Sequence, residues 1–207
     1  MSVELLESIY KSIGPAGVIL ALLGLFGLYL ALKNLIFLNL VHKEFTAHFE
    51  RAARPKNRAF ERAYRGDNPL LSIVWDIVHT HAEHSKDIRA EVAYLFHRNF
   101  ESVSKGLYWI RLISVISPLL GLLGTVFGMV KVFQTIASNA NPDATILAAG
   151  IWEALITTAM GLSIAIPILM LYYLLLLRFK GFHIEAIEYS YRALDIRNKY
   201  TATTNKV

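Results

Sequence analysis

The feature that most constrains this chain is a pair of long apolar runs that carry polar side chains inside them. The runs lie between Ser117 and Leu177 and are separated by a short polar break. Each run is long enough to span a bilayer, for which about 20 apolar residues are needed. Hydrocarbon tolerates hydroxyls and carboxylates only where they face protein or water. The polar groups inside these runs are therefore the first candidates for a functional site.

A third apolar run, from Pro15 to Leu32, and the composition point to a membrane protein. The 207 residues are 55% hydrophobic, whereas roughly 45–50% is typical of soluble domains. A cleaved signal peptide is the competing interpretation of this run, but the run is long for one and no small-residue cleavage pattern follows it. The chain has no cysteine, which excludes disulfides, thiolate catalysis and cysteine-ligated metals.

Basic residues predict the orientation of the chain. Twelve Lys and Arg residues lie between residues 39 and 111 and six follow Leu177, whereas none lies between Val132 and Leu177. The positive-inside rule places the basic segments in the cytoplasm and the N-terminus outside. The predicted order is a periplasmic arm (1–13), a first transmembrane helix (14–38), a cytoplasmic helical loop (39–111), a second transmembrane helix (112–136), a periplasmic loop (137–145), a third transmembrane helix (146–177) and a cytoplasmic helical tail (178–207).

Apolar spacing predicts helices in both cytoplasmic segments. From Leu70 to Phe96 apolar residues recur at steps of three and four, which is typical of an amphipathic helix. Nothing before Leu112 is expected to stop this helix, so it is predicted to run into the second span. The same spacing from Phe182 to Tyr200 predicts that the third membrane helix continues into water and packs through its apolar face.

Small residues form a row along each of the two later spans. Such rows let helix backbones approach closely, and packing is the interpretation favoured for the glycines. A proline in each span is expected to kink its helix. The predicted packing residues are Gly121, Gly124, Gly128, Gly150 and Gly161, and the predicted kinks are at Pro118 and Pro167.

Glu153 is the costliest polar group in the runs. A carboxylate inside a span indicates a polar pathway or a paired site, although Glu153 lies near enough to the outer end to reach the interface. At about 100° per residue, Thr157 lies roughly 40° and Thr158 roughly 140° from Glu153 around the helix. Glu153 and Thr158 can therefore share a narrow pore only if the helix is wound irregularly or neighbouring subunits share the lining.

These residues resemble the ExbB/TolQ/MotA proton-channel family. The likeness rests on Gly121-Leu-Leu-Gly-Thr-Val-Phe-Gly128 and Gly150-Ile-Trp-Glu-Ala-Leu-Ile-Thr-Thr-Ala-Met-Gly161. A single first span followed by a large loop resembles the ExbB/TolQ branch. The resemblance implies an all-α membrane protein with three transmembrane helices and long helical cytoplasmic extensions, assembled as a ring, a pentamer. The family's pore-lining threonines and glutamate correspond to Thr125, Thr158 and Glu153. A small apolar residue is usual at the position of Thr157, so either Thr157 or Thr158 could face the pore.

The resemblance also implies a function. The chain would be a proton-channel, stator-like subunit of a motor in the bacterial inner membrane, with protons as the coupling ion and neither a cofactor nor enzymatic catalysis. It would use the proton motive force to drive an ExbD/TolR-like single-span partner, which supplies a protonatable aspartate, and through it a TonB/TolA-like protein. The tasks implied are outer-membrane transport or envelope maintenance. A passive helical membrane scaffold without ion conduction is the alternative.

Three further features of the sequence bear on what the chain can bind. Lys131 either reaches the outer interface or meets an acidic group of a neighbour or partner. The segment from His79 to His84 contains three histidines and Glu83, but their side chains diverge around a helix, so a solvated surface is favoured and no metal site is predicted. The basic loop can contact lipid headgroups, while its acidic residues argue against nucleic acid as a partner.

Overall fold

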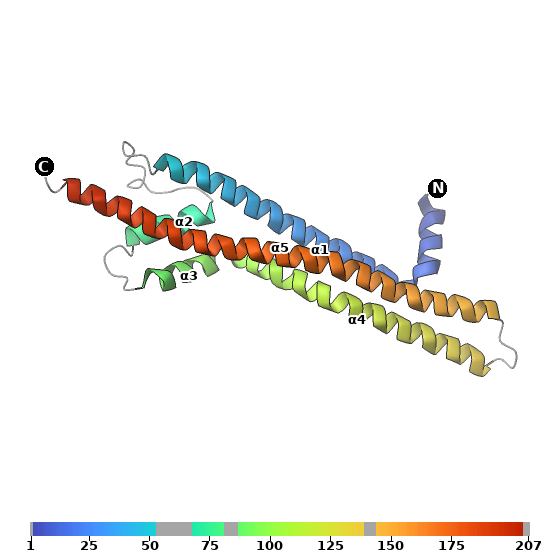
Figure 1. Ribbon diagram of the computed structural model, residues 1–207. Coiled ribbons are helices and arrows are strands. Elements are labelled where there is room, and N and C mark those ends of the chain that lie inside the picture. Colours follow the sequence, from blue (N-terminus) through green and yellow to red (C-terminus); the bar gives the residue numbers. More distant parts are fainter. Residues whose placement is uncertain (1, 53–67, 81–86, 139–143, 205–207) are drawn as a thin grey trace. The chain divides into compact units, whose positions relative to one another are not determined.

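The computed structural model describes residues 2–52, 68–80, 87–138 and 144–204, and within these ranges the chain is helical without strands (Figure 1). The all-α prediction is thus confirmed for the described residues. The helices are α1 (Ser2–Ala52), α2 (Pro69–Thr80), α3 (Ile88–Asn99), α4 (Glu101–Ser138) and α5 (Ala144–Thr204).

Three of these helices are long and apolar enough to cross a membrane. The stretches that qualify are Ala16–Phe49 in α1, Glu101–Ser138 in α4 and Ala144–Lys199 in α5. Each contains the core of one predicted span. The two prolines inside them, Pro118 and Pro167, do not end their helices, and kinks at these positions stay predictions.

The single helix predicted from Leu70 into the second span is wrong at two places. The first is Asp87, whose carboxylate accepts hydrogen bonds from the backbone N–H groups of Arg89 (3.1 Å) and Ala90 (3.3 Å). An aspartate in this position satisfies amides that have no partner within the helix. Asp87 therefore marks the start of α3 as a helix of its own.

The second interruption is at Phe100, between α3 and α4. Its backbone leaves the helical conformation, with φ −108° and ψ 20°. Hydrogen bonds still cross this residue, because Phe100 N–H donates to Phe96 O (2.9 Å) and Ser104 N–H donates to Phe100 O (3.0 Å). The Phe100 ring is fully buried, so packing holds this local departure from the helix.

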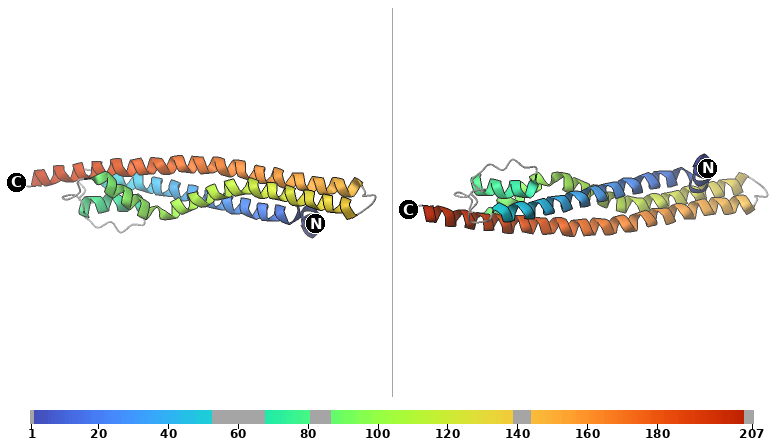
Figure 2. Two further views of the ribbon diagram at one scale, coloured as in Figure 1. Left: turned by 90° about the horizontal axis from the view of Figure 1, so that it is seen from below. Right: turned by 90° about the horizontal axis from the view of Figure 1, so that it is seen from above.

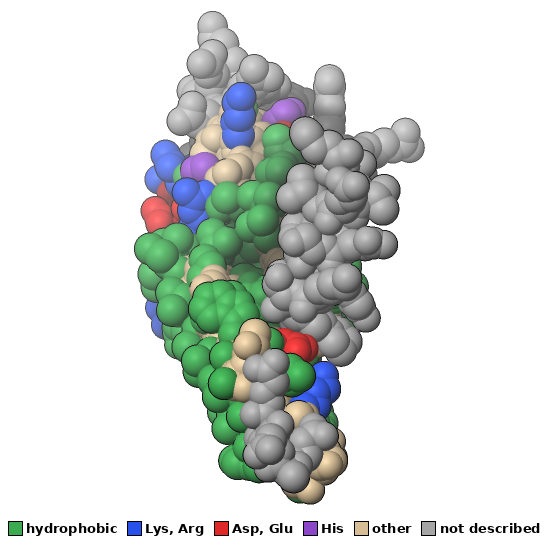
Figure 3. All heavy atoms as spheres, turned by 90° about the vertical axis from the view of Figure 1, so that its right-hand side faces the viewer, with side chains coloured by type: hydrophobic (Ala, Val, Ile, Leu, Met, Phe, Trp, Pro, Cys, Tyr) green, Lys and Arg blue, Asp and Glu red, His purple; other side chains and the backbone are tan. Residues whose placement is uncertain are grey.

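The helices divide into two compact units, and the first comprises residues Met1–Leu32 and Leu107–Tyr173. Within it, α4 and α5 run side by side in opposite directions (Figure 2). Only 22–33% of the most apolar stretch of each long helix is buried. Viewed from the end where α4 and α5 meet the loop between them, most of the described surface is made of hydrophobic side chains (Figure 3). A surface of this kind suits lipid or further protein subunits.

Two glycines of α1 let that helix approach α4 and α5 within the first unit. A Cβ atom on Gly27 would lie 2.7 Å from Ile168 Cδ1 and 3.3 Å from Ile113 Cγ2. A Cβ atom on Gly24 would lie 3.2 Å from Ile164 Cγ1. α1 therefore packs on the side of α4 and α5 that carries these isoleucines.

The second unit comprises residues Lys33–Gly106 and Leu174–Val207 and has an aromatic core. The ring of Tyr189 on α5 packs edge-on against Phe45 (4.7 Å) and Phe49 (4.5 Å) of α1. Ala186 and Ala193, one turn to either side of Tyr189, are buried. The predicted helical continuation of α5 and its packing through the apolar face are confirmed for the described residues, while its place in water stays a prediction.

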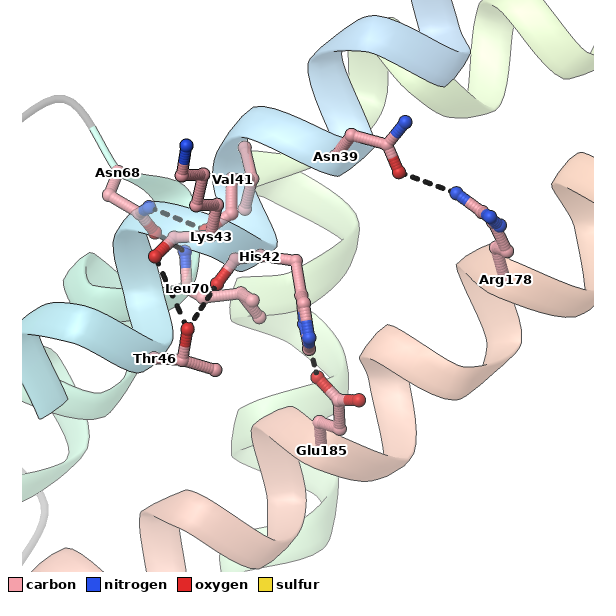
Figure 4. Close-up of polar contacts among 9 residues, drawn as sticks. All are labelled: Asn39, Val41, His42, Lys43, Thr46, Asn68, Leu70, Arg178 and Glu185. Carbon is pink, nitrogen blue, oxygen red and sulfur yellow. Dashed lines mark hydrogen bonds and ion pairs between the residues drawn. The ribbon is translucent and has the colours of Figure 1, made fainter. Parts of the chain in front are cut away.

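Polar contacts complete the second unit (Figure 4). The His42 ring lies 3.4 Å from the Glu185 carboxylate, and the Arg178 guanidinium donates to Asn39 Oδ1, so α1 and α5 are linked twice. Asn68 links α2 to α1, because its amide donates to Val41 O (3.0 Å) while its Oδ1 accepts from the first turn of α2.

Candidate functional site between α4 and α5

The backbones of α4 and α5 approach closely along a seam of small residues. A Cβ atom on Gly121 would lie 2.9 Å from Thr157 O, and one on Gly161 would lie 2.6 Å from Ser117 O. Backbone atoms cannot yield at such distances without moving a helix. The other glycines singled out in the sequence lie in the same seam, where added Cβ atoms would come within 2.5–2.7 Å of side-chain atoms of the opposite helix: Gly124, Gly128 and Gly150.

Thr125 and Thr158 form a hydroxyl pair across this seam. Their Oγ1 atoms are 2.8 Å apart, and Thr158 Oγ1 is also 3.0 Å from Gly121 O. Both residues are half-buried. Because each hydroxyl has one proton and two acceptor lone pairs, the pair retains capacity to bind a further donor. It can therefore order a water molecule or hydrogen-bond a group presented by another chain.

Thr157 has a different environment from its neighbour. It is only 2% exposed, and its hydroxyl donates to Ala154 O at 2.8 Å, with Gly121 O at 3.4 Å. A Cβ atom on Gly124 would lie 2.6 Å from its Oγ1. Thr157 thus fills the seam itself, whereas Thr158 lies at its margin.

Glu153 and Lys131 form a second polar pair across α4 and α5. Lys131 Nζ lies 4.0 Å from Glu153 Oε1, and the two side chains are 65% and 32% exposed. Lys131 thus meets an acidic group, but the carboxylate belongs to the same chain, whereas the sequence predicted the outer interface or an acidic group of a neighbour or partner.

This ionic pair lies on the side of the seam that contacts α1. Lys131 follows Ile113 by 18 residues, which is five full turns, and so points in the same direction. Glu153 precedes Ile164 by 11 residues, which leaves about 20° between them around α5. Since Ile113 and Ile164 contact α1, we call this side the α1 edge.

The threonine pair lies on the other side. Thr125 is 12 residues from Ile113 and Thr158 is six residues from Ile164, and each separation corresponds to about 120° around the helix. We call this side the threonine edge. The predicted pore residues are therefore not brought together in one protomer: Thr125 and Thr158 are on one edge, Thr157 is in the seam, and Glu153 is on the α1 edge.

The close approach of α1 was not predicted from the sequence. Gly24 and Gly27, three residues apart in an apolar helix, are a small-residue signal of the kind that was used for α4 and α5. In the second unit, Asn34 is a buried polar residue packed against Gly106, where an added Cβ atom would overlap the Asn34 side-chain amide. An asparagine inside an apolar helix is the corresponding sequence signal.

The histidine segment falls largely outside the described residues. Its described member, His79, stacks on Trp75 with 4.4 Å between ring centroids, and its Nδ1 lies 3.1 Å from Trp75 O. His81, Glu83 and His84 lie outside the described ranges. Within those ranges there is no group of three or more His, Cys, Asp or Glu residues that could hold a metal ion.

The sequence matches the MotA/TolQ/ExbB proton channel family over residues 51–185. The chain belongs to this family. The matched region contains the whole α4–α5 seam described above, together with α2 and α3 of the second unit. Three apolar helices and membership of this family make the chain a multi-pass membrane protein.

Individual relatives place the chain in the ExbB/TolQ branch of the MotA/TolQ/ExbB family. It is 27% identical over 169 residues to a protein of Methanothermobacter thermautotrophicus named as an ExbB homolog, and the match covers 79% of this chain and 60% of that protein. It is 36% identical over 126 residues to the biopolymer transport protein exbB1 of Vibrio cholerae (60% and 49%). The Tol-Pal system protein TolQ of Haemophilus influenzae is 37% identical over 94 residues (45% and 39%). The matches thus span from about two fifths to three fifths of these relatives.

Proposed function

We propose that the chain is the channel-forming, stator-like subunit of a motor that couples the proton motive force to work on an ExbD/TolR-like single-span partner. Membership of the proton channel family supports this proposal. The names of the relatives favour biopolymer transport or the Tol-Pal system as the task, and hence a TonB/TolA-like protein as the element moved. The membrane is the bacterial inner membrane, with the N-terminus periplasmic and the C-terminus cytoplasmic.

The observation that carries the proposal is the position of the Thr125–Thr158 pair. It lies on the edge of the seam that α1 does not occupy, and exposed leucines flank it on the same side of their helices: Leu122, Leu155 and Leu162. A hydroxyl pair in such an apolar wall offers a polar contact at one depth. A partner carboxyl group at this depth can donate a hydrogen bond to the pair when it is protonated, but when it is ionised it can only accept one, which requires a hydroxyl to give up its bond to a backbone carbonyl.

The proposed assembly is a ring, a pentamer, with the threonine edge toward the axis and α1 toward the lipid. The largely exposed apolar surfaces of α1, α4 and α5 support assembly, because neighbouring subunits and lipid can cover them. Inside the ring, the partner helix contacts hydroxyls from several subunits. A change in protonation of its carboxyl group then favours one arrangement of the partner over another, and the output is displacement or rotation.

The test is proton uptake by vesicles that contain the chain together with its ExbD/TolR-like partner. Thr158→Val and Thr125→Val remove a hydroxyl at nearly constant volume, and we expect each to lower uptake about tenfold or more, as for a hydrogen bond to a charged group worth about 1.5–3 kcal/mol. Thr158→Ser should retain uptake. Thr157→Val is the matched control, because its hydroxyl is confined to the seam, and it should conduct.

The same experiment distinguishes a proton channel from a passive scaffold. A scaffold predicts that the wild-type vesicles take up no protons beyond those of partner-free vesicles, whichever threonine is replaced. Equal uptake by Thr158→Val and Thr157→Val vesicles would show that the threonine pair is not part of the proton pathway.

A further inference from the structure

Lys131 and Glu153 are the isolated charges of their membrane segments. Lys131 is the one charged residue between Leu112 and Ser138 in α4, and Glu153 is the one charged residue between Ala144 and Leu177 in α5. Although the two residues come from different helices, their charged groups lie 4.0 Å apart. Ionisable groups inside membrane segments characteristically pair with one another, because an isolated charge in hydrocarbon is costly.

The pair is separated from the threonines around each helix. Both charged residues lie on the α1 edge, and the threonine edge is about 120° away on each helix. In one protomer, Glu153 therefore cannot touch a group held against Thr125 and Thr158. Any effect of the Glu153 carboxylate on the threonine pair must therefore pass through the packing of α4 on α5.

The pair adjoins the contacts that set this packing. Glu153 precedes Ala154, whose Cβ would lie 2.7 Å from a Cβ atom on Gly128, one turn before Lys131. Within α5, the carbonyl of Ala154 accepts the hydrogen bond of Thr157, and Thr157 contacts α4, where a Cβ atom on Gly124 would lie 2.6 Å from its Oγ1. The Lys131–Glu153 contact thus joins α4 to α5 directly beside the residues that lead to Thr158.

We propose that Lys131 is the charge partner of Glu153, and that this ion pair fixes the register of α4 against α5 so that the threonine pair is correctly placed. Glu153 is then a positioning residue and does not itself carry the proton. This inference rests on the proposed function for its statement about the proton pathway. The ion pair itself, and its effect on the stability of the seam, stand without that function.

The experiment compares four variants of the full chain, assembled with the ExbD/TolR-like partner: Lys131→Met, Glu153→Gln, the double variant Lys131→Met/Glu153→Gln, and the charge swap Lys131→Glu/Glu153→Lys. Two quantities are measured, the apparent melting temperature of the purified complex and proton uptake per complex in vesicles. Each single variant should lower uptake about fivefold, a coupling typical of groups in contact. The double variant and the charge swap should recover to within about twofold of the wild type, because neither leaves an unpaired charge.

The outcomes separate the two proposals. If the double variant and the swap conduct as poorly as Glu153→Gln, Glu153 carries the proton itself and the positioning role is overturned. Adding Thr158→Val to the double variant should abolish the recovered uptake, which shows that the restored pathway is the threonine pathway. If wild-type vesicles take up no protons, the proposed function fails. The melting temperatures then still decide the ion pair: recovery in the double variant supports it, and additive losses overturn it.

Discussion

The hydroxyl oxygens of Thr125 on α4 and Thr158 on α5 lie 2.8 Å apart, on the edge of the seam that faces away from α1. The contact depends on the glycines beneath it, because Thr158 also reaches the carbonyl of Gly121 at 3.0 Å. A side chain at Gly121 would meet the backbone of α5 at 2.9 Å. The glycine row and the hydroxyl pair are therefore one structural arrangement, in which close backbone approach brings two short polar side chains together.

A disulfide in place of the hydroxyl pair should form within one protomer. The chain contains no cysteine, so Thr125→Cys/Thr158→Cys introduces the only thiols, at positions whose side-chain oxygens are already 2.8 Å apart. Mild oxidation should consume both thiols while the chain still runs as a monomer on a denaturing gel. Uptake by this double variant should be low before oxidation and stay low after it, since neither the thiols nor the disulfide replace the hydroxyls well. A covalent dimer as the main product would contradict the contact.

Gly161→Ala should destabilise the protein, whereas Gly181→Ala should not. A Cβ atom at Gly161 would lie 2.6 Å from Ser117 O, a backbone atom, while at Gly181 nothing lies within 4 Å. Overpacking of this kind costs about 1–3 kcal/mol, and alanine in an open helical position gains up to about 1 kcal/mol over glycine. Apparent melting temperatures of the purified variants provide the measurement. Equal shifts in the two variants would mean that the seam is looser than the structure shows.

Asn68→Ala should loosen the start of α2. Asn68 is buried, its Oδ1 accepts hydrogen bonds from the amides of Leu70 (3.1 Å) and Leu71 (3.3 Å), and its amide donates to Val41 O. Loss of such a cap costs about 1 kcal/mol. Hydrogen exchange of the Leu70 and Leu71 amides should accelerate in Asn68→Ala and return toward the wild-type rate in Asn68→Ser, which restores the cap but not the link to α1. Unchanged exchange in the alanine variant would rule out the capping role.

Sequence periodicity predicted the helices but not which of their faces meet. The glycine rows of α4 and α5 identified the packed faces, because steps of three and four place residues on one side of a helix. The angle of roughly 140° between Glu153 and Thr158 was also available from the sequence. What it lacked was the position of α1. Only the contacts of Gly24 and Gly27 with the isoleucines of α4 and α5 show that Glu153 is on the covered side.

Local helix boundaries were harder to predict than long helices. Asp87 has the side chain of a helix cap, yet the apolar spacing on either side of it suggested one continuous helix. Phe100 carries no breaker signal, and its departure from helical geometry follows from tertiary packing of its ring against Phe96, Phe179 and Phe182. The pairing of Lys131 with Glu153 likewise depends on the register between α4 and α5, and the residue spacing within a single helix does not reveal that register.

Cross-linking in the assembled complex measures directly which edge of the seam faces the partner helix. A photo-cross-linking residue is placed at Leu155 or Leu162, which flank Thr158 and are exposed. The control position is Phe127, which is as exposed as Leu155 but lies one turn before Lys131 on the α1 edge. We predict that the first two positions capture the ExbD/TolR-like partner in the assembled complex and that Phe127 does not. Capture from Phe127 and none from Leu155 or Leu162 would contradict the claim that the threonine edge faces the partner.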